Sequence, residues 1–106
     1  MSREYLGEFE HLVLLAVVRL GDRAYGAPIR LLIAERAERQ VSFGAVYSTL
    51  RRLQAKEYLE TREERASGGA GGRPRRVAVL TPDGDTAVRA AQHRLQRMSE
   101  GLLEDL

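Results

Sequence analysis

The chain has 106 residues, of which 43% are apolar, and it contains no cysteine. This length suits one small globular domain, the apolar content excludes a disordered chain, and the lack of cysteine excludes disulfides and thiolate metal sites. The net charge is only +2, but residues 40–80 carry eight cations and four anions, so positive charge gathers in the middle of the chain.

The first predicted helix runs from about Glu4 to Leu20. Its apolar residues cover more than a narrow stripe, so we expect it to be buried on more than one side, in part by a second subunit. A second helix begins near Gly26, with Pro28 in its first turn, and ends by about Gln40. Only a short link separates it from the next helix, which is typical of a helix-turn-helix.

The stretch from Ser42 to Leu59 predicts a third helix. Ser42 is expected to cap it, because a serine hydroxyl can accept a hydrogen bond from an unpaired first-turn amide. Four apolar residues recur at spacings of three and four, which predicts the face that packs on the core. They are Phe43, Val46, Leu50 and Leu53.

The opposite face of this helix is small at its start and cationic in its middle. Small residues allow a close approach to a groove, and arginines can bind phosphate or a guanine edge. This face consists of Gly44, Ala45, Ser48, Arg51, Arg52 and Ala55, with Tyr47 on the flank, where its hydroxyl can reach a phosphate oxygen. The pattern predicts contact with nucleic acid. The alternative is an ordinary surface helix with solvated arginines.

A hairpin is predicted next, with a weak strand at residues 60–65, a glycine-rich loop at 66–72 and a returning strand at 73–81. In the returning strand, period-two alternation places Val77 and Val79 on one side and Ala78 on the other.

The tip of this hairpin is cationic, since it carries Arg73, Arg75 and Arg76. Pro74 holds the chain extended between them, and the cluster suits contact along a minor groove. The alternative is an edge hairpin with a solvated loop.

The last predicted helix follows Thr81 as its N-cap and occupies residues 82–106. One face carries an apolar row with coiled-coil spacing, made of Val88, Ala91, Leu95, Met98 and Leu102. We expect this row to pair with the same row of a second copy, whereas the alternative is packing on the first helix of its own chain.

A pocket for a small molecule is a further hypothesis, placed where the first and last helices of two subunits meet. Phe9, Leu95 and Met98 would line it, although methionine and leucine at helical spacing are more often plain core residues.

Five short motifs occur in a fixed order along the chain. They are L-x-L-L at residues 12–15, A-Y-G at 24–26, V-Y-x-x-L-x-x-L at 46–53, G-R-P-R at 72–75 and L-T-P-x-G at 80–84. Together they resemble the PadR family of bacterial transcriptional regulators, in its short form with a single C-terminal helix. The resemblance extends over about residues 6–84.

This resemblance implies a mainly α fold with a small β-hairpin: a winged helix-turn-helix DNA-binding domain at residues 1–81 and a long C-terminal dimerisation helix at 82–106. It also implies a homodimer on a palindromic operator in double-stranded DNA, acting as a repressor that a small molecule releases. The residues expected to contact DNA are Ser42, Gly44, Tyr47, Ser48, Arg51, Arg52, Arg73, Arg75 and Arg76.

The chain departs from the family pattern at three places. Glu57 stands where a glycine usually follows the recognition helix, and Val77 and Ala78 stand where aromatic residues usually follow the G-R-P-R segment. The last helix has no tryptophan, which argues against an aromatic stacking site for drugs.

Other functions find less support in the sequence. His11 and His93 are the only histidines and no thiol accompanies them, so we expect no metal site and no cofactor. Glu63 and Glu64 are adjacent on a predicted strand and point to opposite faces, and no catalytic motif occurs, so we expect no enzyme. We expect a cytoplasmic protein without membrane contact, since no leader or spanning stretch is seen.

The remaining alternative is a winged-helix interaction module that does not bind DNA. Such a module has no need of the arginine cluster at residues 73–76.

Overall fold

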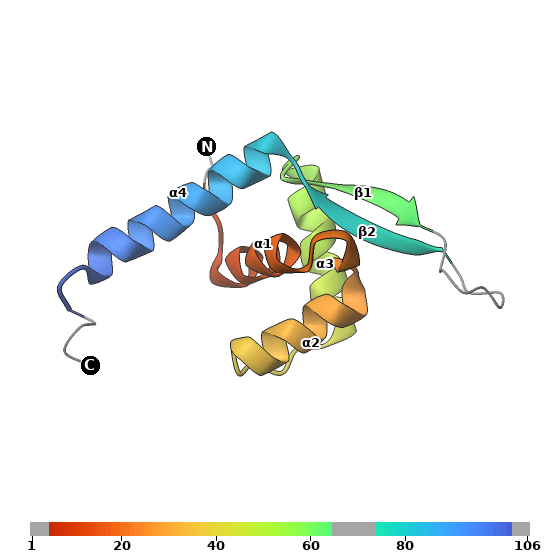
Figure 1. Ribbon diagram of the computed structural model, residues 1–106, viewed down its shortest axis with the longest axis horizontal. Coiled ribbons are helices and arrows are strands. Elements are labelled where there is room, and N and C mark those ends of the chain that lie inside the picture. Colours follow the sequence, from red (N-terminus) through yellow and green to blue (C-terminus); the bar gives the residue numbers. More distant parts are fainter. Residues whose placement is uncertain (1–4, 65–73, 103–106) are drawn as a thin grey trace.

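The computed structural model describes residues 5–64 and 74–102, and they form four α-helices and one antiparallel hairpin (Figure 1). The helices α1, α2 and α3 make the body, while the hairpin and α4 extend from it in different directions. The elements in chain order are α1 (Glu8–Leu20), the short 3-10 helix η2 (Gly21–Arg23), α2 (Gly26–Arg36), α3 (Phe43–Ala55), β1 (Leu59–Glu64), β2 (Arg75–Leu80) and α4 (Pro82–Ser99). The mainly α fold with a small hairpin is therefore confirmed.

The core lies where α1, α2 and α3 cross, and the hairpin covers its edge. Each of the three helices supplies side chains that are almost fully buried, and β2 adds Val77. The fully enclosed side chains are Leu14, Ile29, Leu53, Val13, Val46, Val77 and Thr49. The predicted spacing of Val46 and Leu53 on α3 is confirmed, whereas the burial of Thr49 was not foreseen.

All four helices are shorter than expected. The first begins at Glu8 instead of Glu4, because the Gly7 amide donates to the Glu10 side chain at 3.0 Å and closes the first turn. The second ends at Arg36 instead of about Gln40, and Glu38 then takes a left-handed φ of 54°. The last ends at Ser99, two residues before Gly101 with its φ of 79°. Residues 103–106 lie outside the described part of the chain.

The third helix begins as predicted, because the Ser42 hydroxyl accepts a hydrogen bond from the Ala45 amide at 3.0 Å. Its predicted end was wrong: α3 stops at Ala55, and Glu57 turns the chain with a left-handed φ of 66°. Tyr58 and Leu59 consequently leave the helix and are buried at the start of the hairpin.

The hairpin pairs Leu59 with Leu80 and continues in antiparallel register to Glu64 and Arg75. Val77 and Ala78, which the alternation places on opposite sides of the strand, are both buried, so β2 is covered on both sides at this point. The second edge of β2 also meets the body, where the Ala78 amide donates to the Ala24 carbonyl at 2.8 Å. Arg73 and the glycine-rich loop lie outside the described residues.

One compact joint connects the end of α3, the hairpin and the start of α4. The Thr81 hydroxyl accepts from the Gly84 amide at 2.9 Å and donates to the Glu57 carbonyl at 2.7 Å, and the Thr81 amide donates to the Tyr58 carbonyl at 3.1 Å. Thr81 is thus the predicted N-cap of α4 and also the link that fixes α4 relative to α3.

Candidate nucleic-acid interface

The face of α3 that points away from the core presents uncharged residues first and a cation further on. Gly44, Tyr47 and Arg51 are exposed and Ser48 is partly exposed, while Val46 on the opposite side is fully buried. The spacing of three and four residues explains this division, because it repeats about once per helical turn. The exposed residues form one continuous strip along the helix, as the sequence predicted.

Phe43, which we expected in the core, lies on this exposed side with 44% of its surface accessible. The guanidinium of Arg30 lies 4.6 Å from the centre of its ring. The Arg30 Nε donates to the Val41 carbonyl at 2.7 Å, which holds Arg30 in this position. The first residue of a helix is positioned by the chain that enters it as much as by the helical period, so periodicity alone could not place Phe43.

Tyr47 packs closely against the start of α2. A Cβ atom added to Gly26 would collide with the phenol of Tyr47, including its ring carbon Cζ at 2.6 Å. The rings of Tyr47 and Phe43 are stacked with centroids 6.3 Å apart and planes inclined by 22°. The A-Y-G motif therefore has a physical reason: Gly26 provides the space in which Tyr47 lies, and 46% of Tyr47 remains exposed.

A groove of about 170 Å³ separates α3 from the hairpin. Arg51 of α3 and Arg76 of β2 both line it, although they are far apart in the sequence. The full lining is Tyr47, Leu50, Arg51, Gln54, Leu59, Thr61, Arg76 and Ala78. The tertiary structure thus brings the cationic part of the helix and the cationic strand of the hairpin together at one groove.

The other predicted arginine of the hairpin that is described here, Arg75, lies over the ring of Tyr25 at 4.8 Å. A guanidinium over an aromatic face is attracted to the ring and still exposes its edge. Tyr25 immediately precedes α2, so this contact ties the hairpin to the helix-turn-helix. Tyr25 was not among the predicted site residues, and nothing in its local sequence pattern indicated this partner.

Arg52 is placed differently from Arg51. Its Nε lies 3.5 Å from Glu10 of α1, and another of its nitrogens donates to the Thr49 hydroxyl at 3.2 Å. Lys56 holds the same carboxylate, with its ammonium 2.9 and 3.0 Å from the two oxygens of Glu10. Arg52 is therefore both an exposed cation and part of an ion-pair cluster between α1 and α3.

The Glu10 carboxylate is the centre of this cluster and is only 7% exposed. Burial by itself raises the pKa of the Glu10 carboxyl, but the bonds from Lys56, the Gly7 amide and Arg52 outweigh burial and hold that pKa below its ordinary value. Sequence reasoning missed Glu10, although an acid at the third position of a helix is a known capping signal.

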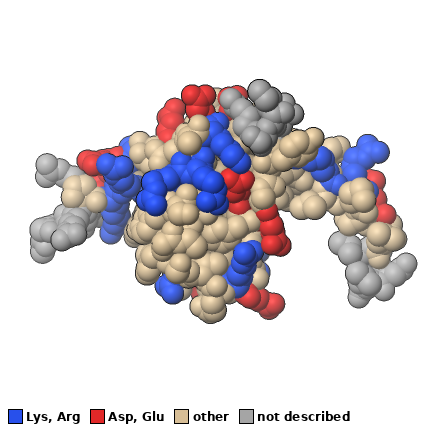
Figure 2. All heavy atoms as spheres, turned by 180° about the vertical axis from the view of Figure 1, so that it is seen from behind, with Lys and Arg blue, Asp and Glu red and all other residues tan. Residues whose placement is uncertain are grey.

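Figure 2 shows the side of the molecule on which α3, partly hidden behind α1 in Figure 1, faces the reader. Lysine and arginine side chains gather in the middle of this face, and a broad uncharged area lies beneath them. Further cations lie at the side from which the hairpin extends, and some acidic side chains border the central cluster. The face combines positive charge with an uncharged surface, as a contact with both phosphates and base edges requires.

The apolar row of α4 is divided between two environments. Val88 and Ala91 are 5% and 6% exposed, because the first half of α4 packs against α1 of the same chain. Leu95, Met98 and Leu102 are 58%, 79% and 64% exposed. The alternative of packing on the first helix thus describes the first two members, and the last three remain uncovered in the single chain. The predicted row was wrong at Leu102, because α4 ends at Ser99 and Leu102 lies in the turn beyond it.

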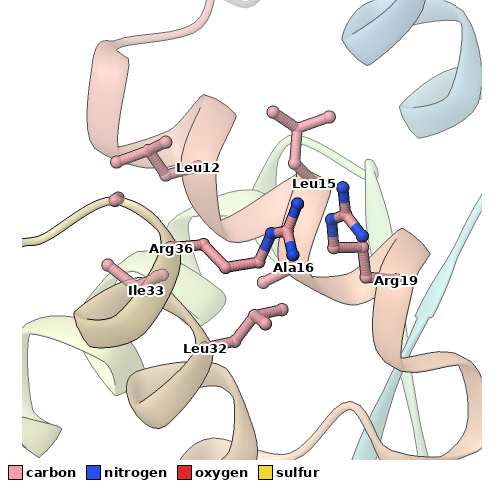
Figure 3. A pocket seen from close by; sticks show the side chains of 8 residues that line it. Leu12, Leu15, Ala16, Arg19, Leu32, Ile33 and Arg36 are labelled. Carbon is pink, nitrogen blue, oxygen red and sulfur yellow. The ribbon is translucent and has the colours of Figure 1, made fainter.

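The groove in Figure 3, of about 300 Å³, lies between α1 and α2 and is mostly apolar. Leu12, Leu15, Ala16, Leu32, Ile33 and Ala37 line it together with Arg19 and Arg36. Figure 3 shows the guanidinium groups of Arg19 and Arg36 turned toward one another beside these apolar side chains. None of the three residues that we expected at a ligand pocket belongs to the lining. Phe9 is partly buried instead, with Arg39 5.1 Å from its ring centre.

His11 is buried on α1, and its Nε2 has no hydrogen-bond partner among the described residues. Burial lowers the pKa of its imidazole, Gln92 of α4 partly offsets this, and Arg94 lowers the pKa further. Within residues 5–64 and 74–102, no three histidine, aspartate or glutamate side chains are grouped as a metal site would require. A search of the same residues for a helix long and apolar enough to cross a bilayer finds none.

Comparison with known proteins adds two findings. Residues 14–90 match the model of a family described as the transcriptional regulator PadR-like family. A search of curated protein sequences finds no match.

Several solved structures share the fold at low sequence identity. A PadR-like transcription factor from Bacteroides fragilis has a TM-score of 0.70 and 22% identity, covering 92% of this chain and 89% of that one. A PadR family regulator from Clostridium difficile R20291 has a TM-score of 0.72 and 20% identity, covering 93% and 97%. F93 from STIV, a winged-helix DNA-binding protein, has a TM-score of 0.69 and 23% identity, covering 92% and 97%.

Proposed function

Because this chain belongs to the PadR-like family of transcriptional regulators, we propose that it is a homodimer that binds a palindromic operator in double-stranded DNA. In this proposal residues 1–81 are the DNA-binding winged helix-turn-helix domain, and α4 is the dimerisation helix. The observation that carries this proposal is the groove at which Tyr47 and Arg51 of α3 meet Arg76 of the hairpin.

In this proposal α3 enters a major groove with its uncharged N-terminal half nearest the bases. Arg51 lies one turn beyond Tyr47 and binds a phosphate or a guanine edge. The hairpin follows the neighbouring minor groove through Arg75 and Arg76, while Arg73 remains a predicted contact outside the described residues. Arg52 stabilises the position of α3 through Glu10 and contacts phosphate with its exposed edge.

The second half of the α4 row supports the dimer. Leu95, Met98 and Leu102 are exposed and apolar, and in a monomer they would remain in contact with water. Pairing with a second copy buries them and places the two α3 helices on half-sites about one helical turn, roughly 34 Å, apart.

The regulatory part of the proposal is a repressor that a small molecule releases. The effector would bind between the first and last helices of both subunits, near Phe9, Leu95 and Met98, and would change the distance between the two α3 helices. Supporting this position, Leu95 and Met98 are exposed in the single chain and so are free to line a pocket that only the dimer completes.

The DNA contact is tested with two arginine variants. Arg51→Ala removes a cation from the groove beside the hairpin, and Arg89→Ala removes a similarly exposed cation from α4, where it pairs with Asp85. Binding of a fluorescent duplex from upstream of the protein's own gene is measured by anisotropy. We expect Arg51→Ala to weaken binding about tenfold or more, since a good contact to a base is worth about 1–3 kcal/mol and each subunit loses one.

Arg89→Ala should bind like the wild type. Equal affinity of the wild type and Arg51→Ala would refute the placement of α3. If no duplex is bound at all, the winged-helix interaction module without DNA binding is the better description.

A further inference from the structure

Phe43 is an exposed aromatic residue at the first position of α3. Its ring is accessible, and contacts with two other side chains hold it in place. The Arg30 guanidinium lies 4.6 Å from the ring centre and the Tyr47 ring is stacked beside it. An apolar group that is both accessible and held in one place is prepared for contact with a partner.

The two side chains that contact the Phe43 ring, Arg30 and Tyr47, are themselves held by other parts of the protein. Arg30 is anchored by its bond to the Val41 carbonyl, and Tyr47 is confined by the Gly26 backbone. The ring therefore loses little conformational freedom when it makes a contact, which favours affinity. A phenylalanine that was merely left on the surface would have no need of this arrangement.

The neighbours of Phe43 define what it can meet. Gly44 follows it, and apart from its neighbours in the helix a Cβ atom built at Gly44 would have only the Ser42 hydroxyl within 4 Å, at 3.8 Å, so there is free space at Gly44. The proposed dimer contact belongs to another element, α4. Phe43 lies on the α3 face that carries Tyr47 and Arg51, and so belongs to the DNA-facing surface of the proposed function.

A phenyl ring cannot hydrogen-bond to a base edge, so it can only read an apolar group. In the major groove the thymine 5-methyl is the apolar group that a base presents, and the N-terminal residues of a recognition helix are those that approach bases. We propose that Phe43 determines operator specificity by packing against a thymine 5-methyl group in each half-site. This inference rests on the proposed function, and Phe43 supplies a preference for thymine that the arginines do not.

The test uses DNA that differs only in this methyl group. Duplexes bound by the purified full-length protein are selected from a random pool, and each thymine of the selected site is replaced in turn by deoxyuridine. We expect one position in each half-site at which the replacement weakens wild-type binding about fourfold, the factor that corresponds to one buried methyl-sized group. Phe43→Ala should weaken binding to the thymine duplex and should no longer distinguish thymine from deoxyuridine there.

Two further variants serve as controls. Phe43→Leu keeps an apolar side chain and should retain part of the methyl sensitivity. Val18→Ala shortens an exposed apolar residue of α1 beside β2 and the start of α4, and should retain all of it.

Two results would overturn the inference while leaving the proposed function intact: a wild type that binds selected DNA without sensitivity to any thymine methyl, or a Phe43→Ala protein that keeps this sensitivity. Failure to select any duplex would overturn both proposals.

Discussion

Two residues show how single backbone positions shape this protein. Glu57 lies in the turn after α3 and has a left-handed φ of 66°, a conformation that glycine adopts without strain. Gly84 lies in the first turn of α4, where a Cβ atom would collide with the Tyr58 carbonyl and approach a Leu80 methyl at 2.9 Å. One position thus carries a side chain under strain, and the other has no space for a side chain.

Glu57→Gly should stabilise the protein by about 1 kcal/mol, because a non-glycine residue in the left-handed region is strained by roughly 1–2 kcal/mol and part of the gain is lost to unfolded-chain entropy. The bond from Thr81 goes to the Glu57 carbonyl and survives the change. Urea denaturation measures the effect. Glu60→Gly, the same change within β1, is the control and should destabilise. Loss of stability in Glu57→Gly would contradict the explanation.

Gly84→Ala should destabilise by about 2 kcal/mol or more, because the colliding atom belongs to the backbone and cannot move aside as a side chain can. Gly44→Ala is a matched change in the first turn of α3, where the added methyl meets open space, and its stability should be unchanged or slightly higher. Thermal denaturation of both variants measures the change in stability. Equal losses of stability in Gly84→Ala and Gly44→Ala would argue against a special role for Gly84.

At the scale of elements, the position of α3 depends on charged contacts as well as on the core. Its C-terminal end is bound to α1 through Glu10, Lys56 and Arg52. The hairpin is held to the start of α2 by Arg75 over Tyr25 and by the bond between Ala78 and Ala24. The helix and the hairpin are therefore both bound to the same body of helices, as the proposed joint contact with DNA requires.

The Glu10 cluster predicts a dependence of stability on pH. The pKa of Glu10 is lower in the folded state than in the unfolded chain, so its contribution is complete above the ordinary value of 4.5 and is lost as the pH falls through the folded pKa. Glu10→Gln should destabilise by about 1–3 kcal/mol at neutral pH, because bonds to a charged group are lost. Urea denaturation from about pH 7 down to about pH 3 should show the difference from the wild type shrinking.

His11 also favours lower stability in acid, since its pKa is lowered too, but it remains in both proteins and cancels in the comparison. A difference between the wild type and Glu10→Gln that stays constant with pH would show that Glu10 acts through packing alone.

The whole molecule is elongated, with extents of 53 × 31 × 21 Å, and the C-terminal half of α4 extends beyond the body (Figure 1). Leu95 and Met98 of this helix, and Leu102 beyond its end, are exposed and are the part of the chain for which a second copy is the proposed partner. In the proposed dimer this helix sets the spacing of the two DNA-binding faces, so changes in the second half of α4 should act on DNA affinity without touching α3.

Met98→Asp should therefore weaken the dimer about tenfold or more while leaving the fold of each chain intact, because Met98 is 79% exposed and a charge there is buried only in the dimer. Gln96→Asp introduces the same charge on another side of α4 and is the control. Sedimentation equilibrium gives the dissociation constants. A wild type that is monomeric at tens of micromolar, the range in which a functional dimer of this kind should form, would refute the dimer.

The features that local physics controls could be read from the sequence. Ser42 and Thr81 cap their helices as predicted, since a cap depends on residues three positions away. The burial of Val46 and Leu53 on α3 and the order of helices and hairpin also follow from spacing, and the family resemblance follows from short motifs. The positions of Gly44, Tyr47 and Arg51 on the exposed face of α3 belong to this group, because a helical period determines which residues share a side.

The helical period does not determine which other elements cover a given side of a helix. Only the tertiary structure decided this. It left Phe43 exposed beneath Arg30, buried Thr49, and bound Arg52 to Glu10. It also packed Val88 and Ala91 on their own chain while leaving Leu95 uncovered. In each case the partner comes from another element, so the outcome depends on how the helices cross and not on the residues within one helix.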